Sequence, residues 1–207
     1  MLVTQAAGIR KGDRVIDVCS APGGKALHAA TKLAGTGSVL SRDVSENKCA
    51  LMRENVERMH MPGVTVEVHD ATLPDPALTD TADVLYCDLP CSGLGIIGRK
   101  CDIKYAVSSE SLNSVTELQK KILQSVWNYV KPGGIMMYST CTIHKAENEK
   151  MVQWICANLP FETVSMEDTL PEVLAGQDTV KNGYLQLLPG QFGTDGFFLS
   201  KLRRKEE

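Results

Sequence analysis

Residues 14–25 read Arg-Val-Ile-Asp-Val-Cys-Ser-Ala-Pro-Gly-Gly-Lys, a short apolar run and a glycine pair that lead into a helix-compatible stretch ending near residue 33. A strand, a tight glycine turn and a helix start in succession let backbone N–H groups approach a ligand closely. The stretch is not a GxGxxG motif. It also matches a phosphate-binding P-loop poorly, because Ala26 follows Lys25 and the upstream glycine is missing. This segment predicts the first strand–turn–helix unit of an α/β ligand-binding fold.

Strand-like and helix-like segments alternate along the rest of the chain. We expect seven strands, near residues 14–19, 38–44, 64–69, 82–89, 135–142, 161–166 and 196–202. The spacing of apolar residues predicts helices over residues 25–33, 46–59, 112–130 and 146–158. Repeated alternation of this kind requires parallel crossovers, so the pattern predicts a doubly wound α/β sheet. Residues 167–195 show no interpretable pattern.

The bulk composition favours one soluble domain. A chain of 207 residues with 43% hydrophobic content can bury one core but is too short for two full-sized domains, so we expect a single domain over residues 1–207. No apolar run reaches the length of a membrane span, and no secretion signal is recognisable, which predicts a cytoplasmic protein without membrane association. The net charge of -3 does not by itself indicate nucleic-acid binding, because phosphate recognition normally requires a basic excess.

The cysteines are scattered and odd in number. The seven lie at positions 19, 49, 87, 91, 101, 141 and 156, and no CxxC pair occurs among them. This spacing suggests neither a disulfide framework nor a standard zinc site, so we expect reduced thiols and no metal.

Polar or reactive side chains follow the carboxyl ends of five predicted strands: Cys19, Asp43, Asp70, Asp88 and Cys141. In an open parallel sheet this edge forms the ligand-binding crevice. Acidic acceptors after a glycine turn suit S-adenosylmethionine, which carries a ribose diol and an adenine but no phosphate. Asp43 is expected to accept from the ribose hydroxyls and Asp70 from the adenine amino group. The alternative is that these two aspartates only cap the turns that follow them.

Two cysteine-containing loops are expected to meet in that crevice. Asp88-Leu-Pro-Cys-Ser-Gly-Leu-Gly95 follows the fourth strand and Tyr138-Ser-Thr-Cys-Thr142 the fifth, so adjacent strands would bring Cys91 and Cys141 together. Methylation at carbon 5 of cytosine requires a thiolate to add first at carbon 6, and a second thiol or base can then assist product release. The residues alone do not decide which cysteine attacks. Asp88 could hold the ring as a proton donor or orienting group, and Lys25 could lend positive charge to the attacking thiolate.

A packed, inert role is the alternative for any cysteine, and we expect it for four of them: Cys19, Cys49, Cys87 and Cys156.

Five motifs in this order and spacing resemble the RNA 5-methylcytosine methyltransferases of the Fmu/Sun and Nop2 type. They are DVCSAPGGK, DLPCSGLG, RKCDIKY, YSTCTIHKAENE and DGFFLSKL, which together span essentially the whole chain. Among these enzymes the chain looks closest to the bacterial type that methylates a cytosine of 16S ribosomal RNA, an rRNA-processing step.

The resemblance implies a Rossmann-like, seven-stranded, S-adenosylmethionine-dependent methyltransferase fold, a mostly parallel sheet with an antiparallel last strand. It implies an RNA (cytosine-5)-methyltransferase in which Cys141 is the nucleophile, Cys91 assists release, and Asp88 and Lys25 complete the catalytic group. The cofactor-binding residues that it implies are Cys19, Ser20, Ala21, Pro22, Gly23, Gly24, Lys25, Asp43, Asp70 and Asp88.

The chain also departs from the family pattern. Ser20 and Ala26 replace alanine and threonine, and Cys101 replaces a proline in a loop expected to touch RNA. We expect the family's N-terminal RNA-binding domains to be absent, which would account for the lack of an excess of basic residues. Cations near residues 99–104 and 201–205 are either RNA contacts or a solvated face.

Two other functions stay open at this stage. One is a non-catalytic core that binds S-adenosylmethionine and RNA, and the other is the same chemistry on transfer RNA. The RNA partner is expected to be ribosomal and the protein monomeric, but neither the target cytosine nor the oligomeric state can be read from the sequence.

Overall fold

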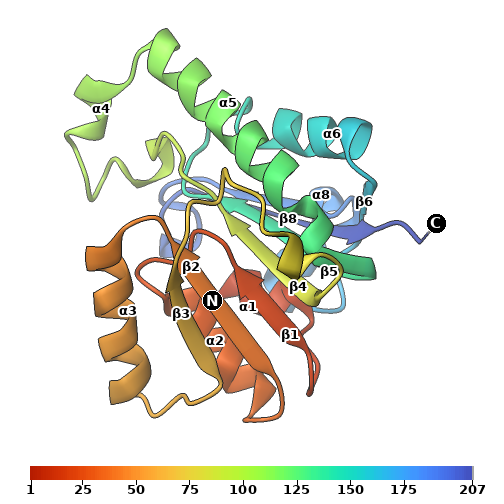
Figure 1. Cartoon of the computed structure of the whole chain (residues 1–207). Helices are drawn as coiled ribbons and strands as arrows, with labels where there is room; N and C mark the ends of the chain where they lie inside the picture. The colour runs from red at the N-terminus through yellow and green to blue at the C-terminus, as the bar shows by residue number, and fades with distance from the viewer. Residues whose placement is uncertain (207) are drawn as a thin grey trace.

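The computed structural model describes residues 1–206, which are built around one twisted sheet in the order β3-β2-β1-β4-β5-β8-β6, with β7 paired to β8 (Figure 1). The strands are β1 (Arg14–Asp17), β2 (Ser38–Asp43), β3 (Val64–Val68), β4 (Ala82–Asp88), β5 (Val130–Thr140), β6 (Phe161–Thr163), β7 (Tyr184–Leu187) and β8 (Phe197–Arg204). β1 to β5 pair in parallel, and β8 runs antiparallel to β5. The expected doubly wound sheet with an antiparallel last strand is confirmed.

The sheet contains eight strands where the sequence predicts seven, because β7 lies in the uninterpreted stretch 167–195. β6 pairs with residues 202–204 of β8 and β7 with residues 197–200, while β5 pairs with the opposite side of β8. β6 and β7 therefore share one edge position in tandem, and the eight strands fill seven positions. β7 is only four residues long, too short to show a strand period of its own.

Helices cover both faces of the sheet (Figure 1). They are α1 (Leu2–Ala7), α2 (Gly24–Leu33), α3 (Glu46–Arg58), α4 (Ile103–Ala106), α5 (Ser109–Val126), α6 (Glu149–Asn158), α7 (Glu172–Ala175) and α8 (Asp178–Lys181). Short 3-10 turns occupy Pro76–Leu78, Leu94–Ile96, Trp127–Tyr129 and Gln191–Gly193. Buried residues of α5 and α6 form one core with the sheet, and those of α1, α2, α7 and α8 form a second core on the other face.

The central strand β4 shows why these residues fold as a two-faced sheet. Leu85 and Cys87 belong to the core under α5 and α6, whereas Val84 and Tyr86 belong to the core under α1 and α2. All four are buried, as expected for an inner parallel strand with both faces covered. Burying each such large side chain contributes roughly 1.5–3 kcal/mol.

No helix within residues 1–206 is long and apolar enough to span a membrane.

Candidate active site

The loop between β1 and α2 turns sharply over the carboxyl end of β2. The Ser20 N–H donates to the Arg42 carbonyl at 2.8 Å, and the Gly23 N–H donates to the Ser20 carbonyl at 2.7 Å. Gly23 has φ 94°, a conformation that favours glycine, and a Cβ there would lie 3.3 Å from Met52 Cγ. Nothing lies within 4 Å of the position of a Cβ on Gly24. The first turn of α2 therefore faces open space at the carboxyl edge of the sheet. It lies at the switch point between β1 and β4, where the order of the strands reverses.

The two predicted cofactor aspartates differ in their surroundings. Asp43 is 7% exposed and accepts from the Ala21 N–H at 3.3 Å and the Ser45 N–H at 3.1 Å. Asp70 is exposed, and both the N–H and the hydroxyl of Thr72 donate to it at 2.8 Å, which lowers its pKa. Both carboxylates thus take part in turns, as the capping alternative predicts. Only Asp43 also joins the β2 end to the glycine loop.

Asp17, which the sequence-based expectations do not include, lies at the last position of β1. Its side chain is fully buried, and neither carboxylate oxygen has a hydrogen-bond partner in the described part of the chain. Burial and the neighbouring Asp88 carboxylate raise the pKa of Asp17 to about 7. A buried carboxyl group without partners is costly unless a ligand compensates it. Its place at a strand end, inside the glycine motif, is the signal that could have identified it.

The loops after β4 and β5 bring the two expected cysteines into contact. Asp88 pairs in register with Ser139, and beyond this pair the sulfur atoms of Cys91 and Cys141 lie 3.0 Å apart, both half-buried. A thiol hydrogen bond from Cys91 lowers the pKa of Cys141, to which the Lys25 ammonium also contributes. The same bond, together with burial, raises the pKa of Cys91. The shared hydrogen bond therefore favours ionisation of one thiol of the pair, and the Lys25 ammonium adds to this effect at Cys141.

Lys25 and Asp88 lie beside this pair. The Lys25 ammonium contacts the Asp88 carboxylate at 2.5 Å, and the Ser139 hydroxyl donates to the other carboxylate oxygen at 2.6 Å. The side chains of Lys25 and Asp88 are each about a quarter exposed, so a ligand can reach both. The structure thus brings together four predicted catalytic residues, Lys25, Asp88, Cys91 and Cys141.

Glu147, also absent from the sequence-based expectations, holds the two cysteine loops together. Its buried carboxylate accepts from the Ser92 N–H at 2.8 Å, the Ser92 hydroxyl at 2.6 Å and the Gln119 amide at 3.3 Å. The Ser92 hydroxyl also lies 2.8 Å from that of Thr142. Because Ser92 follows Cys91 and Thr142 follows Cys141, these bonds fix the separation of the thiols. Glu147 is part of the ENE run in the sequence, but its spacing alone gives no sign of burial.

The other five cysteines lie outside the thiol pair. Burial raises the pKa of Cys19, Cys49, Cys87 and Cys156, consistent with packed thiols. Cys101 is exposed in the loop before α4.

The cations of residues 99–104 and 201–205 do not form two uniformly exposed surfaces. The guanidinium of Arg99 pairs with Asp195 at 2.8 Å. In β8, Lys201 is buried, whereas Arg204 pairs with Asp80 and lies over the Trp127 ring. Of the cations over residues 201–205, Lys201 is therefore not on a solvated face, whereas Arg203 and Lys205 are exposed, because strand alternation sends neighbouring side chains to opposite faces.

Comparison with known proteins identifies the family. Residues 5–203 match the family model described as 16S rRNA methyltransferase RsmB/F. The chain belongs to this family. It is 37% identical over 208 residues to the probable ribosomal RNA small subunit methyltransferase B of Bacillus subtilis, covering 99% of the chain and 46% of that protein. It is 32% identical to ribosomal RNA small subunit methyltransferase B of Cronobacter sakazakii, covering 95% of the chain and 43% of that protein.

Solved structures agree with this RsmB/F assignment. The structure of NSun6 from Pyrococcus horikoshii with SFG matches with a TM-score of 0.85 and 26% identity, over 100% of this chain and 52% of that one. The expected family and fold class are confirmed, and S-adenosylmethionine is the methyl donor of the family, whose matched members are named as methyltransferases. The chain spans less than half the length of these curated RsmB/F relatives.

The site residues of this RsmB/F member fit S-adenosylmethionine. The unpartnered Asp17 carboxyl can compensate a cationic group, and the glycine turn leaves the start of α2 accessible. The charged neighbours Lys25 and Asp88 provide a donor and an acceptor for an amino-acid moiety.

Proposed function

We propose that this chain methylates carbon 5 of a cytosine in RNA, with 16S ribosomal RNA as its substrate class, through a covalent bond between Cys141 and the base. The observation that carries the proposal is the 3.0 Å contact between the sulfurs of Cys91 and Cys141 at the ligand-binding edge of the sheet. Membership of the 16S rRNA methyltransferase family supports the substrate class.

S-adenosylmethionine would be held by the loop from Cys19 to Lys25 together with Asp43, Asp70 and Asp88. When bound, it supplies an electrophilic methyl group. Asp43 is suited to the ribose hydroxyls, because its carboxylate is buried and fixed by two backbone N–H groups. Asp17 adds a negative charge below the glycine turn once it ionises, which favours a cationic ligand.

Cys141 is suited to attack because its pKa is lowered by the thiol of Cys91. Its sulfur forms a bond to carbon 6, and the electron pair of the carbon 5–carbon 6 double bond makes carbon 5 nucleophilic. Asp88, between Lys25 and Ser139, would hold the polar edge of the ring. A cytosine stacked inside an RNA duplex cannot reach this thiol. The target base must therefore be unpaired or flipped out of its stack.

Release requires loss of the proton on carbon 5. As that proton leaves, the double bond re-forms and the bond between carbon 6 and Cys141 breaks, which returns the thiolate. Cys91 is the neighbouring group suited to assist. The largest cause of its raised pKa is its hydrogen bond to Cys141. Once Cys141 is bonded to the base this contact weakens, so Cys91 ionises more readily and can act as a base.

Single cysteine substitutions test the proposal with labelled S-adenosylmethionine and 16S ribosomal RNA. Cys141→Ala should reduce methylation at least about 1000-fold, because the nucleophile is lost. Cys91→Ala should accumulate a protein–RNA adduct that survives denaturing electrophoresis. Cys156→Ala, at a packed cysteine away from the site, is the matched control and should behave as the wild type. Methylation that persists in Cys141→Ala would reject the assignment, and cofactor binding without turnover in the wild-type chain would favour a non-catalytic core.

A further inference from the structure

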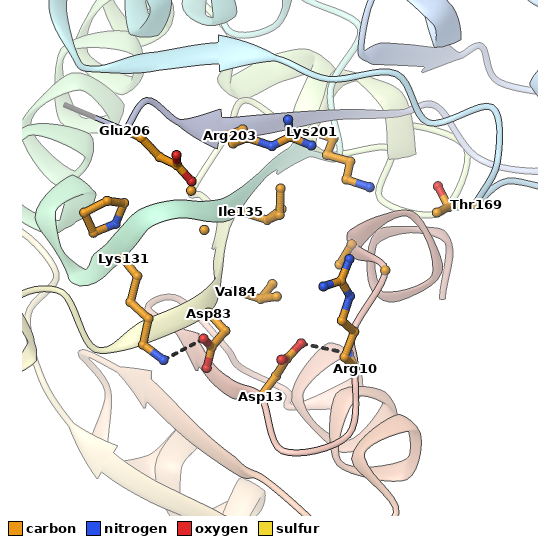
Figure 2. A pocket seen from close by; sticks show the side chains of 15 residues that line it. Arg10, Asp13, Asp83, Val84, Lys131, Ile135, Thr169, Lys201, Arg203 and Glu206 are labelled. Atoms are coloured by element: carbon orange, nitrogen blue, oxygen red, sulfur yellow. Dashed lines mark hydrogen bonds and ion pairs between the residues drawn. The ribbon is translucent and has the colours of Figure 1, made fainter.

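A cavity of about 490 Å³ opens at the edge of the sheet opposite the cysteines (Figure 2). It lies where the amino ends of β4 and β5 separate, because the register between these strands shifts from Ala82 opposite Val130 to Val84 opposite Ile135. Residues 131–134 stand opposite the single residue Asp83, and they bulge outward and form one wall of the cavity. The cavity is in the size range of sites for small organic ligands.

Lys201 is the least expected residue in this cavity. It is 9% exposed, and its side chain lies on the same face of β8 as the core residue Leu199. Figure 2 shows its amine directed into the open space, near Thr169. Neither a hydrogen bond nor an ion pair of its amine occurs within residues 1–206, so the amine is available to a ligand in the cavity. A Cβ on Gly8 would lie 3.7 Å from this amine, so the bare backbone of Gly8 leaves room beside it.

Two further cations, Arg10 and Arg203, line the cavity with Lys201 (Figure 2). Burial and these two guanidinium groups lower the pKa of Lys201, against a weaker opposing effect of Asp168. None of these three cations forms an ion pair within the described residues, so their charges are available to an anion.

The carboxylates that line the cavity are engaged elsewhere or lie apart. Asp13 accepts from the Arg10 backbone N–H at 2.7 Å, and Asp83 pairs with Lys131 at 2.6 Å. Glu206 lies on the far wall, beside Gly133 (Figure 2). The side of the cavity that contains Lys201 therefore has an excess of positive charge.

We propose that this cavity binds a phosphate group through Lys201, Arg10 and Arg203. Guanidinium and ammonium groups that line one cavity suit a tetrahedral oxyanion, which can accept several charge-assisted hydrogen bonds at once. The aliphatic side chains of Ala7, Val84 and Ile135 leave an apolar surface beside it for the rest of a nucleotide-sized molecule. The phosphate belongs either to a free mononucleotide or to the backbone of the RNA. The site does not depend on the proposed cytosine chemistry at the opposite edge.

Thermal unfolding in inorganic phosphate tests the site, with ionic strength held constant by chloride. A ligand that binds only the folded state raises the melting temperature saturably, and we expect a rise of about 3–6 °C at about 50 mM phosphate. Lys201→Met should abolish the rise while leaving the protein folded, because methionine keeps the apolar stem of the side chain and removes only the amine. Arg203→Gln, at an exposed position, should reduce it.

Lys32→Met, at an exposed lysine remote from the cavity, is the matched control and should keep the full rise. An equal rise in the wild type, Lys201→Met and Lys32→Met would be a general salt effect and would overturn the proposal.

Adenosine monophosphate and a single-stranded RNA then distinguish the two sources of phosphate. If the ligand is a mononucleotide, adenosine monophosphate should bind at least about tenfold more tightly than inorganic phosphate, and Lys201→Met should leave RNA affinity unchanged. If the ligand is the RNA backbone, Lys201→Met should weaken RNA binding about threefold or more, and inorganic phosphate should compete with RNA. If Lys201→Met weakens the binding of none of the three probes, the assignment is contradicted.

Discussion

Asp17 combines complete burial with a pKa near neutrality. Its pKa of about 7 lies above the ordinary value, so between pH 4 and 7 the folded state keeps a proton that the unfolded state releases. The stability of the wild type therefore falls as pH rises through this window, by up to roughly 4 kcal/mol in total. Asp17→Asn has no proton to lose. We expect its free energy of unfolding to exceed that of the wild type at pH 8 and the difference to shrink at pH 5, as measured by urea denaturation.

Asp70→Asn is the control for this pH dependence, because the pKa of Asp70 is lowered in the folded protein. Its carboxylate stabilises the folded state above the ordinary pKa and loses this contribution as pH falls. Asp70→Asn should therefore be less stable than the wild type at pH 8. An Asp17→Asn effect of equal size at pH 5 and pH 8 would show that Asp17 does not titrate in this range.

The thiol pair makes a second prediction at the scale of single residues. Because the hydrogen bond shared with Cys91 lowers the pKa of Cys141, alkylation of Cys141 by iodoacetamide should begin at lower pH than for an ordinary cysteine. Cys91→Ala removes the donor and should shift the midpoint of the pH profile upward. Cys91→Ser retains a hydroxyl donor and should recover part of the shift. Peptide mass spectrometry over pH 5–10 gives the profile, and an unchanged midpoint in Cys91→Ala would contradict the assigned hydrogen bond.

At the scale of the elements, the loop after β4 meets the loop after β5 and the residues that precede β8. The Gly95 N–H donates to the Cys141 carbonyl at 3.1 Å, and the Gly196 N–H donates to the Gly95 carbonyl at 2.8 Å. A Cβ on Gly95 would lie 2.3 Å from the Gly196 carbonyl oxygen and 2.8 Å from that of Cys141. Only glycine allows this approach, which positions both cysteine loops.

Gly95→Ala should therefore force the loops apart. Overpacking against two backbone carbonyls costs about 1–3 kcal/mol, and we expect a loss of this size in the free energy of unfolding by urea denaturation. Gly98→Ala is a control in the same loop, since nothing lies within 4 Å of its Cβ position. It should change stability by less than about 1 kcal/mol. Equal losses in the two variants would mean that general loop flexibility, rather than the Gly95 contact, is responsible.

At the scale of the whole molecule, the net negative charge limits the affinity that this chain alone can have for RNA. The net charge is -3, and Arg99 near the cysteine loops is already paired with Asp195. If about three cations contact phosphates, log affinity for single-stranded RNA should fall with log salt with a slope near -2. Affinity should then drop roughly 15-fold between about 50 and 200 mM salt, measured by fluorescence anisotropy. A slope steeper than about -5 would require a basic surface that this charge distribution does not provide.

Much of the fold could be predicted from the sequence because its signals are local. The run from Arg14 to Lys25 indicates a strand, a glycine turn and a helix, and apolar alternation places six more strands. The four catalytic candidates were predictable because the carboxyl ends of parallel strands meet at one edge. β7 was not predictable, since its four residues are stabilised as a strand mainly by pairing with β8.

What the sequence by itself determined is the order of strands and helices, the family motifs, and the edge at which Cys91 and Cys141 meet, because periodicity and turn chemistry act between near neighbours in the chain. Tertiary structure alone decided the burial of Asp17, the hydrogen bonds by which Glu147 joins the two cysteine loops, and the position of Lys201 in the cavity. Each of these depends on which distant groups surround a side chain, and therefore on desolvation and through-space charge, which spacing along the chain does not encode.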